Sequence, residues 1–376
     1  MSDSRKRPLS QTGRARRRFL EGSALAAVGT SAAVLVGSRT AAAQAGSAAA
    51  PATCPTVPTP MKDVEGKVAF ITGGNSGIGL GIARAFTDAG MKVAITYRTK
   101  ANLDSAMEQL KGVADRVHAI NVDVTDRAAM EKAADEVVKR FGKVHAVVAN
   151  AGVAVIGGIS KASYEDWDWG MGVNLNGVFN TIHSFLPRIQ SHGEGGAVIA
   201  TSSLAGLVAH GIAGVYTVSK YGVVGLMEAL RHELLDTNIA VSVFCPGIVN
   251  TNIGSSARNR PGGAGAAPPP RPRPPAGGAP GPGGAAATMQ NAAPGMDALE
   301  AGQRVLRGMQ NNDMWVLTTP EFEHEFQARG DAIVASLPTD VNPSAERIRV
   351  GSFLVGKTDY ARERDKKRCE RAKAKK

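Results

Sequence analysis

Cysteines and metal-binding patterns are scarce in this chain. Only three cysteines occur among 376 residues, too few and too scattered for a disulfide framework or a zinc site, although a bridge between Cys54 and Cys369 stays open. The third, Cys245, ends an apolar run and is predicted to be a buried small hydrophobe. The seven histidines show no HExxH pattern and no paired ligand spacing, so we predict no metal site.

The body of the chain lacks a surplus of either charge, although the whole chain has a formal net charge of +11. The positive charge is concentrated in residues 1–45 and 361–376. This distribution argues against a nucleic-acid-binding face on the folded body. We expect the basic C-terminal residues to form a solvated or frayed end.

No hydrophobic run is long enough for a stable membrane span, since Glu and several small polar residues interrupt the best candidate, between residues 18 and 39. Residues 1–45 instead have the parts of a signal peptide: RRRFL at 16–20, a weakly apolar stretch and a terminal AQA. We predict export by the twin-arginine route to a periplasmic or extracellular location. The alternative is a cytoplasmic protein whose translation starts at Met61.

The segments after the signal differ in composition. Nine prolines and eight glycines fall between residues 261 and 284, a composition that holds neither helix nor sheet and predicts a disordered insert. The predicted segments are a Pro/Ala linker at 46–62, one domain formed by 63–254 and 295–340, the Pro/Gly-rich insert at 255–294, and a C-terminal extension with a basic tail at 341–376.

Within the domain, short β-branched runs alternate with longer amphipathic stretches, which predicts a single α/β domain with a doubly wound parallel sheet in three αβα layers, a Rossmann-like fold. The expected strands are 68–72, 92–97, 117–122, 144–150, 197–202, 239–245 and 314–318. The expected helices are 78–89, 101–113, 126–141, 164–189, 216–237, 298–309 and 321–337.

A glycine-rich turn follows the first expected strand in AFITGGNSGIG. Gly73, Gly77 and Gly79 stand between that strand and a helix, where glycine lets the backbone approach a pyrophosphate at the helix N-terminus. The spacing fits neither G-x-G-x-x-G nor a Walker loop. It favours dinucleotide binding, with a turn that serves only helix packing as the alternative.

The second expected strand ends in Tyr97-Arg98-Thr99-Lys100. An acidic residue there would bind the ribose 2′-hydroxyl of NAD(H), whereas a basic residue accommodates the 2′-phosphate of NADP(H). The acid is absent and two cations are present. NADP(H) is therefore favoured over NAD(H).

Tyr216 is the only one of five tyrosines with a lysine four residues later, which places Tyr216 and Lys220 on one helix face. A neighbouring ammonium would lower the pKa of the phenol, so that the pair could exchange a proton with an alcohol or a carbonyl. Ser203 ends the preceding expected strand, where its hydroxyl could hold the substrate oxygen.

Further motifs surround this pair: TGGNSGIG from Thr72, Asp123-Val124, ANAG at 149–152, VNLNG at 173–177, YTVSK and PGIVNT at 246–251. In order and spacing they resemble the short-chain dehydrogenase/reductase family over about residues 62–254 and again near 296–337. The stretches GVNLNGVFN, SSARNRP and DYARERDKKR are similar to the aryl-alcohol Cα-dehydrogenases of that family, which oxidise benzylic secondary alcohols.

The resemblance implies a role for each matching residue. Tyr216 would be the acid/base, Lys220 would lower its pKa and bind the nicotinamide ribose, and Ser203 would orient the substrate oxygen. Asn174 would hold a relay water at a helix distortion. The positions implied for the cofactor are Thr72, Gly73, Asn75, Ser76, Gly77, Ile78, Gly79, Tyr97, Arg98, Asp123, Val124, Asn150, Ala151, Gly152, Tyr216, Lys220, Pro246, Gly247, Val249 and Thr251.

The sequence therefore predicts an NADP(H)-preferring alcohol dehydrogenase or carbonyl reductase, acting on a small secondary alcohol, ketone or aldehyde, with aromatic compounds as one candidate class. A non-catalytic dinucleotide-binding sensor on the same fold is the alternative. The resemblance also implies a homodimer or homotetramer. The chain departs from the family pattern at Ala149, where the family usually has Asn, and after Thr251, where the insert stands in place of the substrate lid.

Overall fold

The computed structural model describes residues 53–261 and 295–374. The predicted signal peptide and most of the predicted insert lie outside these ranges, so their boundaries stay predictions.

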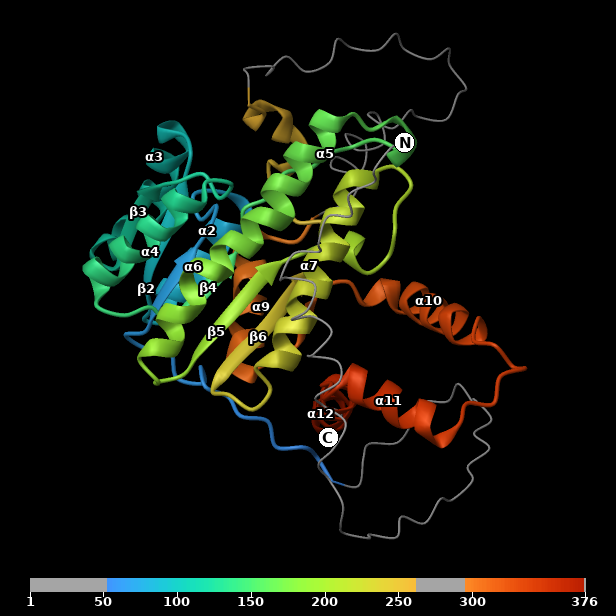
Figure 1. The fold of residues 1–376 in the computed structure, drawn as a ribbon. Helices are drawn as coiled ribbons and strands as arrows, with labels where there is room; N and C mark the ends of the chain where they lie inside the picture. Colours follow the sequence, from blue (N-terminus) through green and yellow to red (C-terminus); the bar gives the residue numbers. More distant parts are fainter. Residues whose placement is uncertain (1–52, 262–294, 375–376) are drawn as a thin grey trace, which may run out of the picture. The chain divides into compact units, whose positions relative to one another are not determined.

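The core of the fold is a seven-stranded sheet in which every pair of neighbours is parallel (Figure 1). Its strand order is β3-β2-β1-β4-β5-β6-β7. Strands β2 and β3 are added on one side of β1, and β4 to β7 are added on its other side. This topology confirms the doubly wound, Rossmann-like prediction. The strands are β1 Val68–Ile71, β2 Lys92–Tyr97, β3 Val117–Asn121, β4 Ala146–Ala149, β5 Gly196–Thr201, β6 Ile239–Cys245 and β7 Trp315–Leu317.

Successive residues of the central strands enter two different cores, because side chains alternate across a sheet. Phe70 of β1 belongs to the core on one face and Ile71 to the core on the other, and both are fully buried. Helices α4, α6 and α7 cover the first face, and α2, α3 and α9 the second (Figure 1). Burial on both faces explains why the strands read as continuous apolar runs.

The helices largely follow the amphipathic stretches of the sequence. The α-helices are α2 Gly77–Asp88, α3 Lys100–Gln109, α4 Arg127–Phe141, α5 Tyr164–Met171, α6 Gly177–Ser191, α7 Gly214–Glu233, α9 Ala298–Asn311, α10 Glu323–Ala335, α11 Ala345–Val355 and α12 Tyr360–Ala374. The shorter turns are η1 Lys111–Arg116, η2 Ile159–Lys161, η3 Gly172–Asn176, η4 Leu204–Gly206, η5 Ile253–Asn259 and η6 Pro320–Phe322. None of these helices combines the length and hydropathy that a membrane crossing requires.

The single helix expected over 164–189 was wrong in one respect. It is interrupted by η3, a π-helical turn, in which the N–H of Gly177 bonds the carbonyl of Gly172 five residues earlier. The extra residue of such a turn changes the helix register and frees backbone groups. The distortion falls at Asn174, as the resemblance implied.

Helices α2 and α9 cross in close contact because both have glycine at the crossing. A Cβ on Gly81 would lie 1.8 Å from the carbonyl oxygen of Ala298, and one on Gly302 would lie 2.2 Å from that of Gly81. Backbone therefore packs directly on backbone. The contact fixes α2, whose N-terminus faces the cleft described below, against the segment that follows the insert.

The predictions for the linker and the basic tail were partly wrong, because both segments pack on the domain. Met61 of the linker is fully buried, and Cys54 forms a disulfide bond with Cys369 of α12. Helix α12 is not a frayed end, since Glu363, Lys366 and Cys369 are buried on one of its faces. Cys245 is buried, as expected.

The buried face of α12 is held by charge pairs instead of apolar packing. Asp359, just before the helix, accepts from Arg231 Nε at 2.7 Å, and Glu363 accepts from the N–H of Met314 at 3.0 Å. The Nζ of Lys366 lies 2.6 Å from Asp313. A sequence as polar as α12 can pack on the domain because these partners satisfy its charges.

The prediction of disorder from residue 255 onward was wrong for its first residues. They form η5, and Ser256 in it is buried. Its Oγ accepts from the N–H of Ala154 at 3.0 Å. Residues 262–294 lie outside the described part of the chain.

Candidate active site

A cleft lies at the carboxyl ends of the strands, where the strand order changes direction between β1 and β4. Open parallel sheets place ligand sites at this switch point. The predicted residues that line it are Gly73, Asn75, Ser76, Gly77, Ile78, Tyr97, Arg98, Asp123, Val124, Asn150, Ala151, Gly152, Ser203, Tyr216, Lys220, Pro246, Gly247, Val249 and Thr251. Thr72, Gly79 and Asn174 are not in the lining.

The glycine turn leaves the start of α2 free to bind an anion. Gly73 and Gly77 have φ of 64° and 51°, a conformation that residues with a Cβ rarely adopt. Ser76 at the N-cap makes no capping hydrogen bond, and the first turn contains no acidic side chain. The N–H groups and the dipole of α2 are thus available to a phosphate.

Two predicted residues support this turn from behind. A Cβ on Gly79 would lie 2.2 Å from the Gly73 carbonyl oxygen, so only glycine fits there. Thr72 is buried, and its Oγ1 accepts from the N–H groups of Asn150 at 2.8 Å and Ala151 at 3.0 Å. These contacts tie the end of β1 to the end of β4 behind the glycine turn.

Arg98 occupies one end of the cleft. Its Nε lies 3.4 Å from Asp123, and its Nη1 donates to the carbonyl of Asn259 at 3.3 Å. Lys100, the other predicted cation, lies outside the lining and pairs with Asp104 on its own helix. Of the two cations that follow β2 in the sequence, only Arg98 therefore lines the cleft.

Ser203, Tyr216 and Lys220 meet at the opposite end. Lys220 is 2% exposed, its Nζ donates to the carbonyl of Thr201 at 2.9 Å, and it lies 5.6 Å from the centre of the Tyr216 ring. Burial lowers the pKa of Lys220 to about 8. Burial also raises the pKa of Tyr216, an effect that a hydrogen bond with the Ser203 hydroxyl partly offsets.

Burial is the main cause of both pKa shifts, and the lowering of the Tyr216 pKa by Lys220 stays a prediction. Burial disfavours phenolate and ammonium alike, since each charged form loses hydration. Tyr216 is therefore held as a neutral phenol, the form that can donate a proton.

Asn174 is completely buried behind this end of the cleft. Its Oδ1 accepts from the N–H of Val153 at 2.8 Å, and its Nδ2 donates to the Val153 carbonyl and to Ser219 Oγ. A Cβ on Gly152 would lie 3.3 Å from Asn174 Oδ1 and 3.6 Å from Lys220 Nζ. Both N–H groups of the Asn174 side chain are thus committed to structural bonds, and its Oδ1 already accepts one.

The segment after β6 forms another wall. The carbonyl of Pro246 accepts from the N–H of Leu204, next to Ser203, at 2.8 Å. A Cβ on Gly77 would lie 2.9 Å from Thr251 Cγ2. This segment consequently contacts both the catalytic end and the phosphate turn.

Sequence reasoning missed the cleft residues contributed by η5 and its flanks, Arg258 and Asn259 among them. The segment is held in place by Arg260, which pairs with Asp166 and lies 4.9 Å from the centre of the Trp169 ring. Its position next to a Pro/Gly-rich stretch hid these residues, since composition there predicted no order. Arg258 and Arg260, two charged residues just before the Pro/Gly-rich stretch, were the available sign that this segment has a function.

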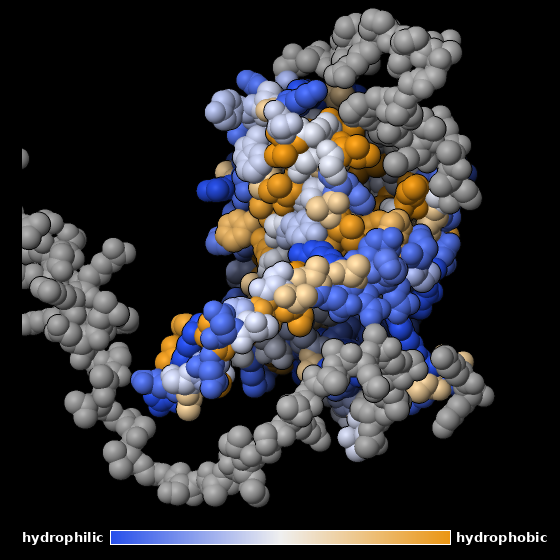
Figure 2. Space-filling model, turned by 90° about the vertical axis from the view of Figure 1, so that its right-hand side faces the viewer, coloured by the Kyte–Doolittle hydropathy of each residue, from blue (hydrophilic) through white to orange (hydrophobic). Residues whose placement is uncertain are grey.

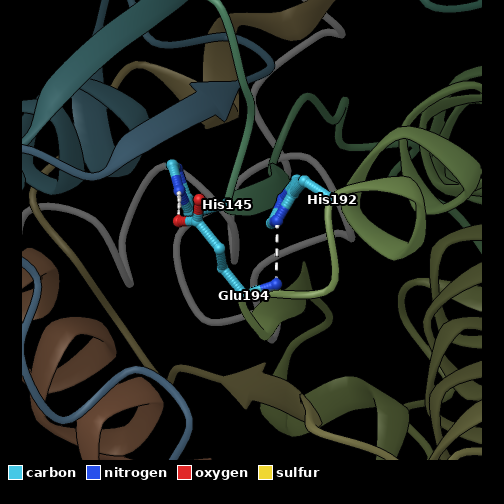
Figure 3. Close-up of side chains that lie close together, drawn as sticks. All are labelled: His145, His192 and Glu194. Atoms are coloured by element: carbon cyan, nitrogen blue, oxygen red, sulfur yellow. Dashed lines mark hydrogen bonds and ion pairs between the residues drawn. The ribbon is translucent and has the colours of Figure 1, made fainter.

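One His/Glu cluster outside the cleft has the composition of a metal site. His145, His192 and Glu194 lie together at the opposite, amino-terminal edge of the sheet (Figure 3). However, His145 Nδ1 accepts from the N–H of Val68 and its Nε2 faces Glu194, while His192 Nδ1 accepts from the N–H of Glu194. These bonds use the imidazole lone pairs that a metal would need.

Two ammonium groups complete this cluster. Lys67 and Lys143 both pair with Glu194, so its carboxylate is already neutralised. The Lys143 and Lys67 bonds, together with His145, hold the pKa of Glu194 far below its usual value. The cluster is a structural clamp between β1, β4 and the turn before β5.

The fold and the cleft are matched by known proteins. A family model described as short chain dehydrogenase matches residues 67–262. A C alpha-dehydrogenase of Sphingobium sp. strain SYK-6 is 33% identical over 312 residues, which cover 82% of this chain and 99% of the relative. A short chain dehydrogenase/reductase from Burkholderia phymatum, solved in complex with NAD, is 28% identical with a TM-score of 0.66 and covers 75% of this chain and 99% of its own.

The apo form of LigO from Sphingobium sp. strain SYK-6 is 34% identical with a TM-score of 0.62, and it covers 78% of this chain and 98% of its own. With the family model and the relatives in agreement, the chain belongs to the short-chain dehydrogenase family and is an NAD(P)-binding oxidoreductase of alcohol and carbonyl compounds.

Proposed function

We propose that the protein is an NADP(H)-preferring oxidoreductase that interconverts a secondary alcohol and a ketone or aldehyde, with Tyr216 as the acid/base. One observation carries the proposal. A single cleft joins the uncapped N-terminus of α2 and the guanidinium of Arg98 to the hydroxyl groups of Ser203 and Tyr216. The first two groups suit the phosphates of a dinucleotide, and the last two suit the oxygen of an alcohol or carbonyl.

The bound nicotinamide would supply the hydride donor or acceptor. In reduction, the Ser203 hydroxyl holds the carbonyl oxygen and Tyr216 donates its proton to that oxygen. Tyr216 enters the reaction in this direction as a phenol, and its hydrogen bond with Ser203, which acts against the rise of its pKa, makes it a better proton donor. In oxidation, the phenolate of Tyr216 would accept the hydroxyl proton of the alcohol while the alcohol carbon gives its hydride to the nicotinamide, and the ammonium of Lys220 would stabilise that phenolate.

The NADP(H) preference is supported by positive charge at the Arg98 end of the cleft. Arg98 extends from the end of β2, and Arg258 of η5 lines the same cleft. Two guanidinium groups can bind a 2′-phosphate through charge-assisted hydrogen bonds. NAD(H) is the alternative, and the Burkholderia phymatum relative solved with NAD supports it.

Aromatic secondary alcohols and aryl ketones are the substrate class we propose. The likeness to a C alpha-dehydrogenase supports this class. Exposed apolar side chains also occur on the segments around the catalytic side chains, namely Ile156, Ile212, Ile248 and Ile253. An apolar ring would contact such side chains without leaving a buried charge unpaired.

We further propose that the protein is exported and that it acts as a homodimer or homotetramer. The disulfide bond between Cys54 and Cys369 supports export, since such bonds persist in oxidising compartments. A chain starting at Met61 would lack Cys54. An exported enzyme has no cytoplasmic NADPH supply, so we expect it to hold its cofactor tightly and to recycle it by oxidising one substrate while reducing another.

A substrate screen tests the function. Purified mature protein is incubated with aryl and aliphatic secondary alcohols and ketones, and NADPH and NADH are followed by absorbance. We expect turnover of aryl compounds with NADP(H). Cofactor binding without turnover of any compound would favour the alternative, a non-catalytic dinucleotide sensor. Purified protein that contains no nucleotide and releases added cofactor readily would favour the alternative, a cytoplasmic protein whose translation starts at Met61.

A further inference from the structure

Helices α10 and α11 stand apart from the cores of the domain. We call residues 323–355, which comprise both helices and their connection, the C-terminal hairpin. Every residue from 327 to 358 is exposed, and neither helix buries a side chain. Figure 1 shows the two helices beside the sheet and its covering helices. Helices in proteins gain most of their stability from tertiary packing, and neither of these two helices buries a side chain against the domain.

The hairpin exposes many large hydrophobic side chains. Phe353, Leu354 and Val355 are 84%, 77% and 69% exposed. Six further large hydrophobic side chains are exposed to between 42% and 65%: Ile333, Val334, Leu337, Val341, Ile348 and Val350. Together these side chains expose on the order of 1,000 Å², spread over both helices and their connection. Figure 2 views the molecule from this side and shows hydrophobic residues at its surface.

Both ends of the hairpin are anchored to the domain, so it is not a frayed terminus. Where it begins, Thr319 is buried, and the guanidinium of Arg329 lies 5.4 Å from the centre of the Tyr221 ring on α7. Where it ends, Asp359 is 1% exposed and bound to Arg231, and the disulfide bond of Cys369 follows. The chain leaves the domain and returns to it, so the hairpin is attached to the domain at both ends.

The two helices of the hairpin carry opposite charges. Glu323, Glu325 and Asp331 outnumber Arg329 on α10, whereas Arg347 and Arg349 outnumber Glu346 on α11. Among the described residues, no ion pair joins the two helices within one chain. The acidic helix of one copy is therefore complementary to the basic helix of another.

We propose that the C-terminal hairpin is the surface through which two copies of this chain associate, with α10 of each copy packed against α11 of the other about a two-fold axis. Such an interface is self-complementary, as a two-fold axis requires. Its apolar area is close to the roughly 800 Å² per partner that a stable interface buries. The proposal deepens the homo-oligomer proposed above by assigning its contact surface.

The first test removes the apolar contact. The double variant Phe353→Asp/Leu354→Asp is compared with the wild type and with Phe353→Leu/Leu354→Met, which keeps the surface apolar. Mass is measured by light scattering after gel filtration, and cofactor binding reports that the domain is folded. We expect the mass of the Asp variant to fall by half, with wild-type mass in the Leu/Met control and cofactor binding in all three.

Two outcomes would overturn the proposal and are distinguishable. A monomeric wild type would overturn both the hairpin interface and the homo-oligomer. An oligomeric wild type whose mass is unchanged in the Asp variant would overturn the hairpin interface alone, and the oligomer would then use another surface.

A second test shows that the contact is between copies. One variant carries Arg347→Glu and Arg349→Glu, and another carries Glu323→Arg and Glu325→Arg. Alone, each places like charges at both contacts of its own dimer and is expected to dissociate. A mixture of the two restores opposite charges at both contacts, so we expect the mass to return. A mixture that remains at the lower mass would contradict pairing of α10 with α11.

Discussion

Cys54 and Cys369 are bonded to each other across 315 positions of sequence, which ties the segment before the domain to its last helix. The same helix is held by buried ion pairs between Lys366 and Asp313 and, just ahead of it, between Asp359 and Arg231. The disulfide bond and the ion pairs thus act on one element of structure.

We expect reduction of this bond to lower the stability of the protein by about 2–4 kcal/mol, because the unfolded chain regains freedom and α12 has little apolar surface to hold it. Thermal unfolding is measured with and without a reductant. The double variant Cys54→Ser/Cys369→Ser is the control, and it should unfold at one temperature in both conditions. A wild-type transition that ignores the reductant would contradict a stabilising bond.

Tyr216→Phe should abolish proton transfer while leaving the cleft intact. We expect turnover to fall by about 10²–10⁴-fold with cofactor affinity unchanged. Tyr221→Phe is the matched control on the same helix, since its hydroxyl bonds only the carbonyl of Leu207 among the described residues. Steady-state rates and fluorescence titration with NADPH measure the two effects. Full activity in the Tyr216 variant would remove it from the proposed role.

Arg98→Ala and Arg258→Ala should each weaken NADPH binding by roughly 10–100-fold, the effect of one charge-assisted contact, with little change for NADH. Lys100→Ala is the control, because its ammonium pairs with Asp104 outside the cleft. Titration with both nucleotides gives the ratio of affinities. Equal losses for NADPH and NADH would show that these arginines do not read a 2′-phosphate.

The η5 segment should retain the cofactor through its link to α5. Asp166→Asn weakens the pair with Arg260, and we expect NADPH to dissociate several-fold faster while its rate of chemical conversion changes less. Asp168→Asn is the matched control on the same helix. Stopped-flow fluorescence measures the dissociation rate, and identical rates in the two variants would contradict a retaining role.

Acidification should destabilise the clamp around His145. Burial lowers the pKa of His145, against which its bond to Glu194 acts. Below the ordinary histidine pKa of about 6.5, the unfolded chain therefore binds a proton more readily than the folded one, and stability falls as the pH falls toward the lower, folded value. Protonation also removes the acceptor that Nδ1 offers to the N–H of Val68.

Thermal unfolding between pH 7.5 and pH 5.5 tests this dependence. We expect His145→Gln to lose part of the wild-type pH slope, by roughly 2–4 °C, the shift produced by about 1 kcal/mol in a domain of this size. His210→Gln, in the loop before α7, is the control and should keep the slope. An unchanged slope in the His145 variant would exclude this histidine as the source.

The fold and most of the cleft could be predicted because their signals are local. The four-residue spacing of Tyr216 and Lys220 and the glycines around Gly77 lie within single elements or turns, where neighbours in sequence are neighbours in space. The alternation of short apolar strands with amphipathic helices along the chain likewise predicted the three layers from local signals. The cofactor-binding and catalytic roles of these residues stay predictions until the experiments above are done.

The remaining features depend on partners far away in sequence. Glu363 and Lys366 read as solvated charges, and only Met314 and Asp313, some fifty residues earlier, reveal that they are buried. The four-residue spacing shows that an ammonium lies near Tyr216, but not how far the two side chains are removed from water, which is the main cause of both pKa shifts. Long-range desolvation cannot be read from a four-residue pattern.

The bond between Cys54 and Cys369 also closes the polypeptide into a covalent ring that contains the whole sheet and every residue of the cleft. A protease that cuts once anywhere inside the ring converts it to an open chain without releasing a fragment. The cleaved molecule keeps its mass until a reductant separates the two pieces. In an oxidising environment, the enzyme could therefore be nicked and remain one molecule.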